Sequence, residues 1–113
     1  MLTDELLALV LASLDELKAL NVTVIDVRGK TSITDYMVVA TGTSNRHVRA
    51  VAEHVVLEAK RAGELPIGVE GEREGEWALV DLTDVILHVM RAGVREFYAL
   101  EKLWDVDAPT GTG

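Results

Sequence analysis

The 113-residue sequence contains no cysteine, only 2 prolines and few aromatic residues (4%). The absence of cysteine excludes disulfide bonds, thiolate nucleophiles and cysteine-ligated metal sites, and it fits a reducing compartment. We therefore expect a cytoplasmic protein. The apolar start of the chain predicts neither an export signal nor a membrane span, because Asp4 and Glu5 stand where export needs positive charge and Asp15 interrupts the run.

Positive charge is also scarce, since 11 Lys and Arg residues stand against 19 Asp and Glu residues and give a net charge of -8. This acidity repels phosphate backbones and anionic lipid, so we expect no direct sequence-specific binding of nucleic acid and no membrane partner. A protein partner would have to present basic groups. The alternative is that the charge only maintains solubility.

Hydrophobic periodicity predicts a first helix over about 4–20, with Thr3 as its N-terminal cap and Asn21 at its end. β-Branched residues predict a strand over 22–27, and a second strand is expected over 36–41. The remaining predicted elements are a helix capped by Thr43 or Ser44 that runs to about 62 before Gly63, strands over 67–70, 76–82 and 85–90, and a short helix over 94–100.

The order of these elements predicts a single α/β domain over 1–104, followed by a frayed tail over 105–113. The strand, helix and strand between 36 and 70 suggest a parallel crossover, whereas the short connection between the last two strands requires antiparallel pairing. We therefore expect a mixed, mostly five-stranded sheet flanked by two long helices and a short C-terminal helix.

The predicted hairpin separates its residues into two faces. One face carries small branched residues and is expected to form the core under the two long helices. The other face carries Trp77, Leu79 and Asp81 beside Ile86, His88 and Met90. It is either an interface anchor with an acidic rim, or core covered by the C-terminal segment with Phe97, Tyr98, Leu103 and Trp104.

Two motifs resemble phosphate-binding turns. Gly29-Lys30-Thr31 lacks the earlier glycine of a phosphate-binding loop, because Val24 occupies that position. The turn Gly42-Thr43-Ser44 precedes a helix, as in nucleotidyltransferases, but no Asp-x-Asp pair is present to hold metal ions. A helix cap without a nucleotide is the preferred interpretation, and a nucleotide-binding or nucleotidyltransferase-like enzyme is the alternative.

No metal site or cofactor is expected. His47 and His54 are seven residues apart, which separates them by about 10 Å on a helix and is too far for one metal ion. His88 lies in a predicted strand. Each of the three histidines is interpreted as a surface or boundary residue, and no Ser, His and Asp arrangement predicts nucleophilic catalysis.

Three blocks of sequence together resemble the signature of the ribosomal silencing factor (Iojap) family. They are Val27 to Val48, Val69 to Met90, and Arg95 to Trp104. The resemblance covers nearly the whole chain. It implies a fold distantly related to nucleotidyltransferases, without catalysis.

Members of this family bind the fourteenth protein of the large ribosomal subunit (the L14-type protein) on the intersubunit face. They obstruct docking of the small subunit and so repress translation when nutrients are short. The resemblance implies a contact surface made of Tyr36, Met37, Glu70, Glu76, Trp77, Leu79, Asp81 and His88. A homodimer formed through the Trp77 face is a further alternative.

Overall fold

The structure is a computed structural model that describes residues 1–98 and, among these, the side chains of residues 1–96. The predicted tail over 105–113 and the aromatic residues predicted to cover Trp77 lie outside the described side chains. The elements in chain order are α1 (Thr3–Glu16), β1 (Leu20–Asp26), β2 (Tyr36–Gly42), α2 (Asn45–Arg61), β3 (Gly68–Glu70), β4 (Trp77–Asp81), β5 (Val85–Arg91) and α3 (Ala92–Tyr98).

The strands form one five-stranded sheet in the order β1-β2-β5-β4-β3. Among the strands of the described residues, only β2 and β5 pair in parallel, and the three other pairings are antiparallel, so the predicted mixed sheet is confirmed. The strand β3 runs in the same direction as β2, as the predicted crossover requires, but β5 and β4 lie between them. The parallel pairing of β2 with β5 was not predicted.

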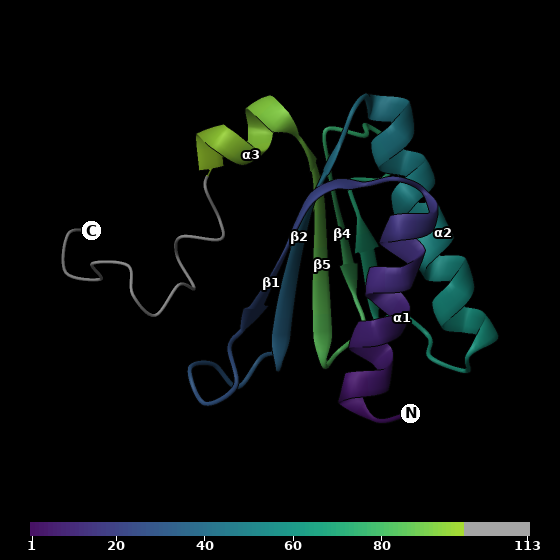
Figure 1. Ribbon diagram of the computed structural model, residues 1–113, viewed down its shortest axis with the longest axis vertical. Helices are drawn as coiled ribbons and strands as arrows, with labels where there is room; N and C mark the ends of the chain where they lie inside the picture. The colour runs from purple at the N-terminus through teal and green to yellow at the C-terminus, as the bar shows by residue number, and fades with distance from the viewer. Residues whose placement is uncertain (99–113) are drawn as a thin grey trace, which may run out of the picture.

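Helices α1 and α2 cover one face of the sheet, while α3 lies on the other side at one end (Figure 1). Alternate residues of β2, β4 and β5 point toward α1 and α2 and form the main core. This core includes Val38, Ala40, Ala78, Val80, Leu87 and Val89 from the strands, with Leu6, Val10, Leu14, Val48, Val51 and Val55 from the helices. These buried residues confirm the predicted core face of the hairpin. Full burial of each Val or Leu side chain contributes about 1.5–3 kcal/mol to the stability of the fold.

The ends of α1 differ from the prediction. Thr3 is the first helical residue, and Leu2 occupies the cap position, where its backbone N–H donates to the Glu5 carboxylate at 2.9 Å. The helix ends at Glu16, before the predicted Leu20, because Lys18 adopts a φ of 59° that a helix cannot continue. Asn21 lies in β1, beside an irregularity in the pairing with β2.

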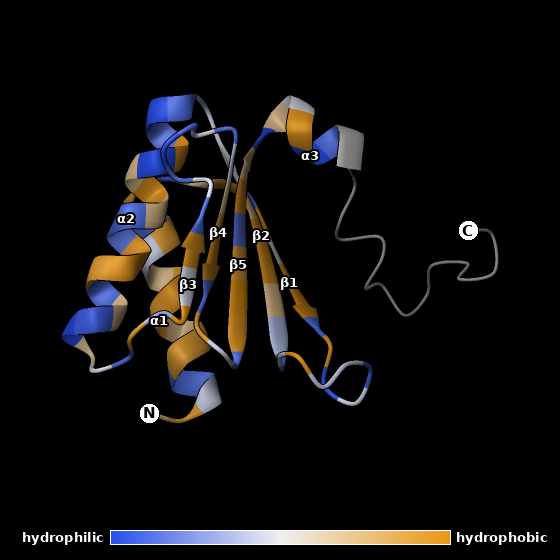
Figure 2. Ribbon diagram, turned by 180° about the vertical axis from the view of Figure 1, so that it is seen from behind, coloured by the Kyte–Doolittle hydropathy of each residue, from blue (hydrophilic) through white to orange (hydrophobic). Residues whose placement is uncertain are grey.

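Both predicted caps of α2 are confirmed. The Ser44 hydroxyl accepts the backbone N–H of His47 at 3.0 Å, which satisfies an unpaired donor of the first turn. Gly63 follows the helix with a φ of 84°, and the next residue, Glu64, donates its N–H to the Ala59 carbonyl at 2.9 Å. Figure 2 shows polar residues on the side of α2 turned away from the sheet.

A smaller core lies on the sheet face opposite α1 and α2. It contains Ile25, Val27, Met37, Val39 and Met90, with Trp77 and Val94 packed against it. The Arg95 guanidinium fastens α3 to this face by donating to the hydroxyls of Thr41 and Thr23, both at 2.9 Å, and to the carbonyl of Asn21. Within the described residues, no helix combines the length and the apolar composition needed to cross a membrane.

Candidate functional site

The sheet face that points away from α1 and α2, named the outer face below, carries six of the eight residues predicted to bind a partner. Cross-strand pairs place Glu70 opposite Leu79 and Leu79 opposite His88 in one row. A second row joins Asp81 to Ile86 and Ile86 to Met37. Trp77 starts the third row, opposite Met90. Since alternate residues share a face, these rows lie side by side.

The remaining two residues lie elsewhere. Glu76 immediately precedes Trp77 and is exposed at the start of β4, so it borders the outer face. Tyr36 belongs to the core under α1 and α2 and is 9% exposed, with the Arg28 guanidinium 5.0 Å from its ring centroid. The structure does not bring Tyr36 together with the other seven residues.

A hydrogen bond links the two rings of the outer face. The Trp77 indole N–H donates to Nδ1 of His88 at 2.9 Å, with the ring centroids 5.8 Å apart and the planes tilted by 51°. His88 is only 7% exposed, so its interpretation as a surface or boundary residue was wrong. Burial lowers the pKa of His88 from its ordinary 6.5 to about 4, because the charged imidazolium loses hydration.

The side chains of the outer face differ in how far they are buried. Met37 (6% exposed) and His88 lie underneath, whereas Trp77 and Leu79 are half-buried and Glu70 is exposed. The Asp81 carboxylate is half-buried and accepts the backbone N–H of Thr83 at 2.9 Å, so it also holds the turn between β4 and β5. An apolar centre with an acidic border results.

The turn between β3 and β4 fixes the position of Trp77. Gly71 has a φ of 76°, and a Cβ at this position would lie 2.0 Å from the carbonyl oxygen of Trp77. Gly75 has a φ of 73°, and its Cβ would lie 2.4 Å from the carbonyl oxygen of Asn45. Only glycine fits these positions, so the turn is held tightly against β4 and α2.

The chain is similar in sequence to known proteins over nearly its whole length. Residues 2–112 match the family described as "Ribosomal silencing factor during starvation". The ribosomal silencing factor of Haemophilus influenzae is 46% identical over 99 residues, which cover 88% of this chain and 97% of that protein. The chain belongs to the ribosomal silencing factor family. The predicted resemblance is therefore confirmed.

Relatives of the family extend beyond bacteria. The mouse protein named "Mitochondrial assembly of ribosomal large subunit protein 1" is 35% identical over 89 residues, covering 76% of this chain and 39% of that longer protein. A crystal structure of a Chromobacterium violaceum protein superposes with a TM-score of 0.91 at 38% identity and covers 100% of both chains. The likeness of the silencing factor fold to nucleotidyltransferases stays a prediction.

The described part of this silencing factor contains no group of three or more His, Asp or Glu side chains that could hold a metal ion. Its two other histidines have structural partners. His47 accepts the Thr43 backbone N–H through Nδ1 at 2.9 Å and donates from Nε2 to the Leu17 carbonyl at 2.7 Å. His54 contacts the Glu16 carboxylate at 2.9 Å.

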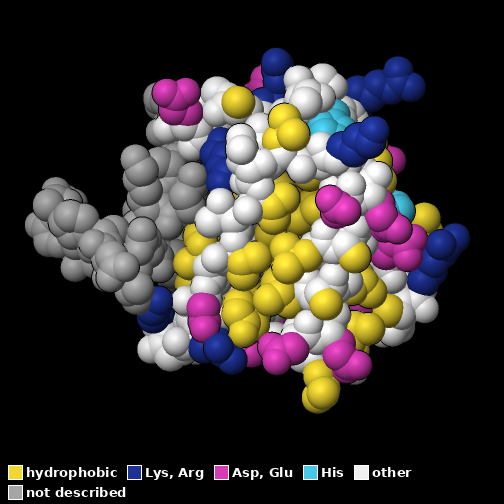
Figure 3. Space-filling view, viewed as in Figure 1, with side chains coloured by type: hydrophobic (Ala, Val, Ile, Leu, Met, Phe, Trp, Pro, Cys, Tyr) yellow, Lys and Arg dark blue, Asp and Glu magenta, His cyan; other side chains and the backbone are white. Residues whose placement is uncertain are grey.

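Sequence reasoning missed the exposed apolar residues of the edge strand β1, which are Leu20 (46%), Val22 (39%) and Val24 (40%). Leu20 pairs with Thr41 and lies on the outer face, whereas Val24 pairs with Val38 and lies on the face toward α1 and α2, because the pairing shifts register between them. Figure 3 shows hydrophobic side chains gathered on the face seen in Figure 1, with acidic side chains along its lower rim. The apolar residues were visible in the sequence, but the position of β1 at the sheet edge was not.

Proposed function

We propose that this chain is a cytoplasmic ribosomal silencing factor that binds the large ribosomal subunit through its L14-type protein and obstructs joining of the small subunit. The observation that carries the proposal is the family match over residues 2–112. The name of the mouse relative, which refers to assembly of the large ribosomal subunit, supports the choice of subunit.

The contact surface of this proposal is the part of the outer face that solvent reaches. Trp77 and Leu79 supply a half-buried apolar centre, and Glu70, Glu76 and Asp81 supply an acidic border. Buried aromatic anchors surrounded by polar rims are typical of protein interfaces. An acidic border on a chain of net charge -8 is complementary to a basic ribosomal protein and accelerates encounter at low salt.

Steric occupancy is sufficient for this function, so we propose that the chain acts without catalysis. A blocker that occupies one subunit disfavours subunit joining by the free energy of its own binding. At a free concentration of 100 times its dissociation constant, this amounts to about 2.7 kcal/mol. A stable complex of this kind buries about 800 Å² on each partner.

The decisive experiment follows subunit joining by sedimentation with purified ribosomal subunits and the purified chain. The expected result is that the chain travels with the large subunit and reduces joining. Glu76→Lys should weaken both effects, because it reverses the charge of an exposed border residue with no side-chain hydrogen bond among the described contacts.

Glu53→Lys is the matched control, since it makes the same change of charge at an exposed position of α2, away from the outer face. It should inhibit joining as well as the parent does. If the parent binds neither subunit, the proposed function is wrong. If both charge variants lose binding equally, net charge and not the outer face determines the contact.

A further inference from the structure

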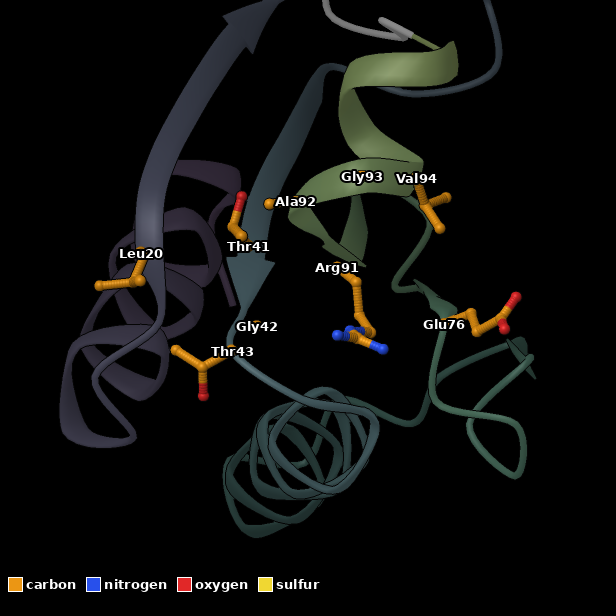
Figure 4. Close-up of a pocket in the computed structure, with 9 residues that line it drawn as sticks. All are labelled: Leu20, Thr41, Gly42, Thr43, Glu76, Arg91, Ala92, Gly93 and Val94. Atoms are coloured by element: carbon orange, nitrogen blue, oxygen red, sulfur yellow. The ribbon is translucent and has the colours of Figure 1, made fainter.

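An open cleft of about 620 Å³ lies where β2 and β5 end, and it shares Glu76 with the surface proposed to contact the ribosome (Figure 4). Its size is within the range of small-molecule sites. The residues that line it are Leu20, Thr41, Gly42, Thr43, Glu76, Arg91, Ala92, Gly93 and Val94.

The topology of the sheet makes this location favourable for a ligand. The neighbouring parallel strands β2 and β5 end side by side, with Gly42 paired to Arg91. The chain continues from β2 into α2 on one face of the sheet and from β5 into α3 on the other face (Figure 1). In α/β sheets, ligands bind in the crevice that opens where such connections diverge.

Arg91 gives the cleft a positive group. Figure 4 shows its side chain extending from the end of β5 into the space between the Gly42–Thr43 turn and Glu76. One guanidinium nitrogen donates to the Asn45 side-chain oxygen at 3.2 Å, and among the described residues no carboxylate lies within ion-pair distance of Arg91. The other N–H donors of its planar fork remain available to an oxyanion.

The backbone turn at the start of α2 is occupied by internal contacts. The Thr43 N–H donates to Nδ1 of His47 at 2.9 Å, and the His47 N–H donates to the Ser44 hydroxyl at 3.0 Å. A negatively charged group in the cleft would therefore depend on Arg91. This arrangement differs from the phosphate-binding turn considered from the sequence.

The rest of the lining suits a molecule with an apolar part. Leu20, Ala92 and Val94 contribute apolar surface, and a Cβ added at Gly93 would meet nothing within 4 Å, so the wall is open there. Glu76 lies across Arg91 from the turn at the start of α2, and its carboxylate can accept hydrogen bonds from hydroxyl or amino groups. The net charge of -8 favours a ligand with a single phosphate over a polyphosphate.

We propose that this cleft binds a small metabolite of nucleoside monophosphate size, with its phosphate on Arg91 and its apolar part against Leu20, Ala92 and Val94. The proposal goes beyond the silencing function and does not depend on it. Its test needs no ribosome, so the two proposals can fail separately.

The test is a titration of the full chain with adenosine monophosphate, followed by backbone-amide NMR. Saturable shifts are expected at Gly42, Thr43 and residues 91–94. Adenosine and inorganic phosphate, titrated separately, should each bind more weakly than the nucleotide. Arg91→Gln should weaken nucleotide binding at least about tenfold, because it removes a charged donor from the phosphate.

Arg49→Gln is the matched control, since Arg49 lies on α2 and donates to the Arg73 carbonyl at 3.0 Å. It should bind as the parent does. Arg91→Lys keeps the charge but loses the planar fork of donors, so its affinity should lie between those of the parent and Arg91→Gln. It serves as the test variant if Arg91→Gln does not fold. The proposal is overturned if no shifts saturate at millimolar nucleotide, if Arg91→Gln and Arg91→Lys both bind like the parent, or if adenosine or phosphate alone binds as tightly as the nucleotide.

Discussion

Trp77 donates its indole N–H to Nδ1 of His88 across the β4–β5 pair at 2.9 Å. An imidazole nitrogen accepts a hydrogen bond only when it is unprotonated, so this contact requires neutral His88 with its proton on Nε2. The half-buried Trp77 ring is thereby oriented by a buried partner beneath it. The contact links the stability of the fold to the surface proposed to bind the ribosome.

The first prediction concerns the effect of acid on stability. The pKa of His88 is about 4 in the folded chain against an ordinary 6.5, so the unfolded chain binds more protons between these values. The stabilisation linked to His88 should therefore be fully present above a pH of about 6.5. The free energy of unfolding should fall by up to about 3 kcal/mol as the pH drops to about 4. Denaturant unfolding at a series of pH values measures this loss.

His88→Asn is the informative variant for this prediction, because its side-chain oxygen can accept from Trp77 without titrating. The loss of stability between these pH values should become smaller in this variant. His54→Asn alters a partly exposed histidine paired with Glu16 and should keep the full loss. An unchanged pH dependence in His88→Asn would contradict the assignment.

The second prediction concerns the affinity for the large subunit. Trp77→Ala removes the largest side chain of the outer face and should weaken binding by more than about 2 kcal/mol, or roughly thirtyfold, if Trp77 is a central anchor. Titration of labelled chain with purified large subunits measures the dissociation constant. Leu57→Ala, at a 47% exposed apolar residue of α2, is the control and should bind normally. Unchanged affinity in folded Trp77→Ala would remove Trp77 from the surface.

The sequence was most informative where structure is local. Ser44 and Gly63 mark the ends of α2 through contacts within one turn, and both were identified. The pairing of Trp77 with Met90 was also predictable, because the short connection between the strands leaves one even register. The parallel pairing of β2 with β5 was missed, since these strands are far apart in the chain and carry no local signal of contact.

The site was predicted less completely for a different reason. Tyr36 and Met37 are consecutive strand residues, so their side chains point to opposite faces and both could not belong to one surface. The burial of His88 was not foreseen, because a histidine in a strand is compatible with a core only when a partner such as the Trp77 N–H is available. That partner depends on cross-strand register and side-chain orientation.

The third prediction concerns the turn that positions Trp77. Gly71→Ala would place a Cβ 2.0 Å from the Trp77 carbonyl oxygen in addition to the strain of a positive φ, and it should destabilise the fold by more than about 2 kcal/mol. Gly63→Ala has the same backbone strain with nothing within 4 Å of the added Cβ, so it should cost only about 1 kcal/mol. Denaturant unfolding compares the two variants. Equal costs would show that the close approach at Gly71 is relieved by movement of the turn.

The fourth prediction concerns the connection between the two long helices. His47 joins the Thr43 N–H to the Leu17 carbonyl, and His47→Ala leaves both groups without this partner. The expected loss of stability is about 1–2 kcal/mol, since the Leu17 carbonyl at the partly buried contact keeps its desolvation cost, whereas water can accept from the exposed Thr43 N–H. His54→Ala removes only a contact with the exposed Glu16 carboxylate and should cost less than about 1 kcal/mol. Urea unfolding of the two variants at neutral pH gives both values, and a larger loss in His54→Ala would contradict the structural role assigned to His47.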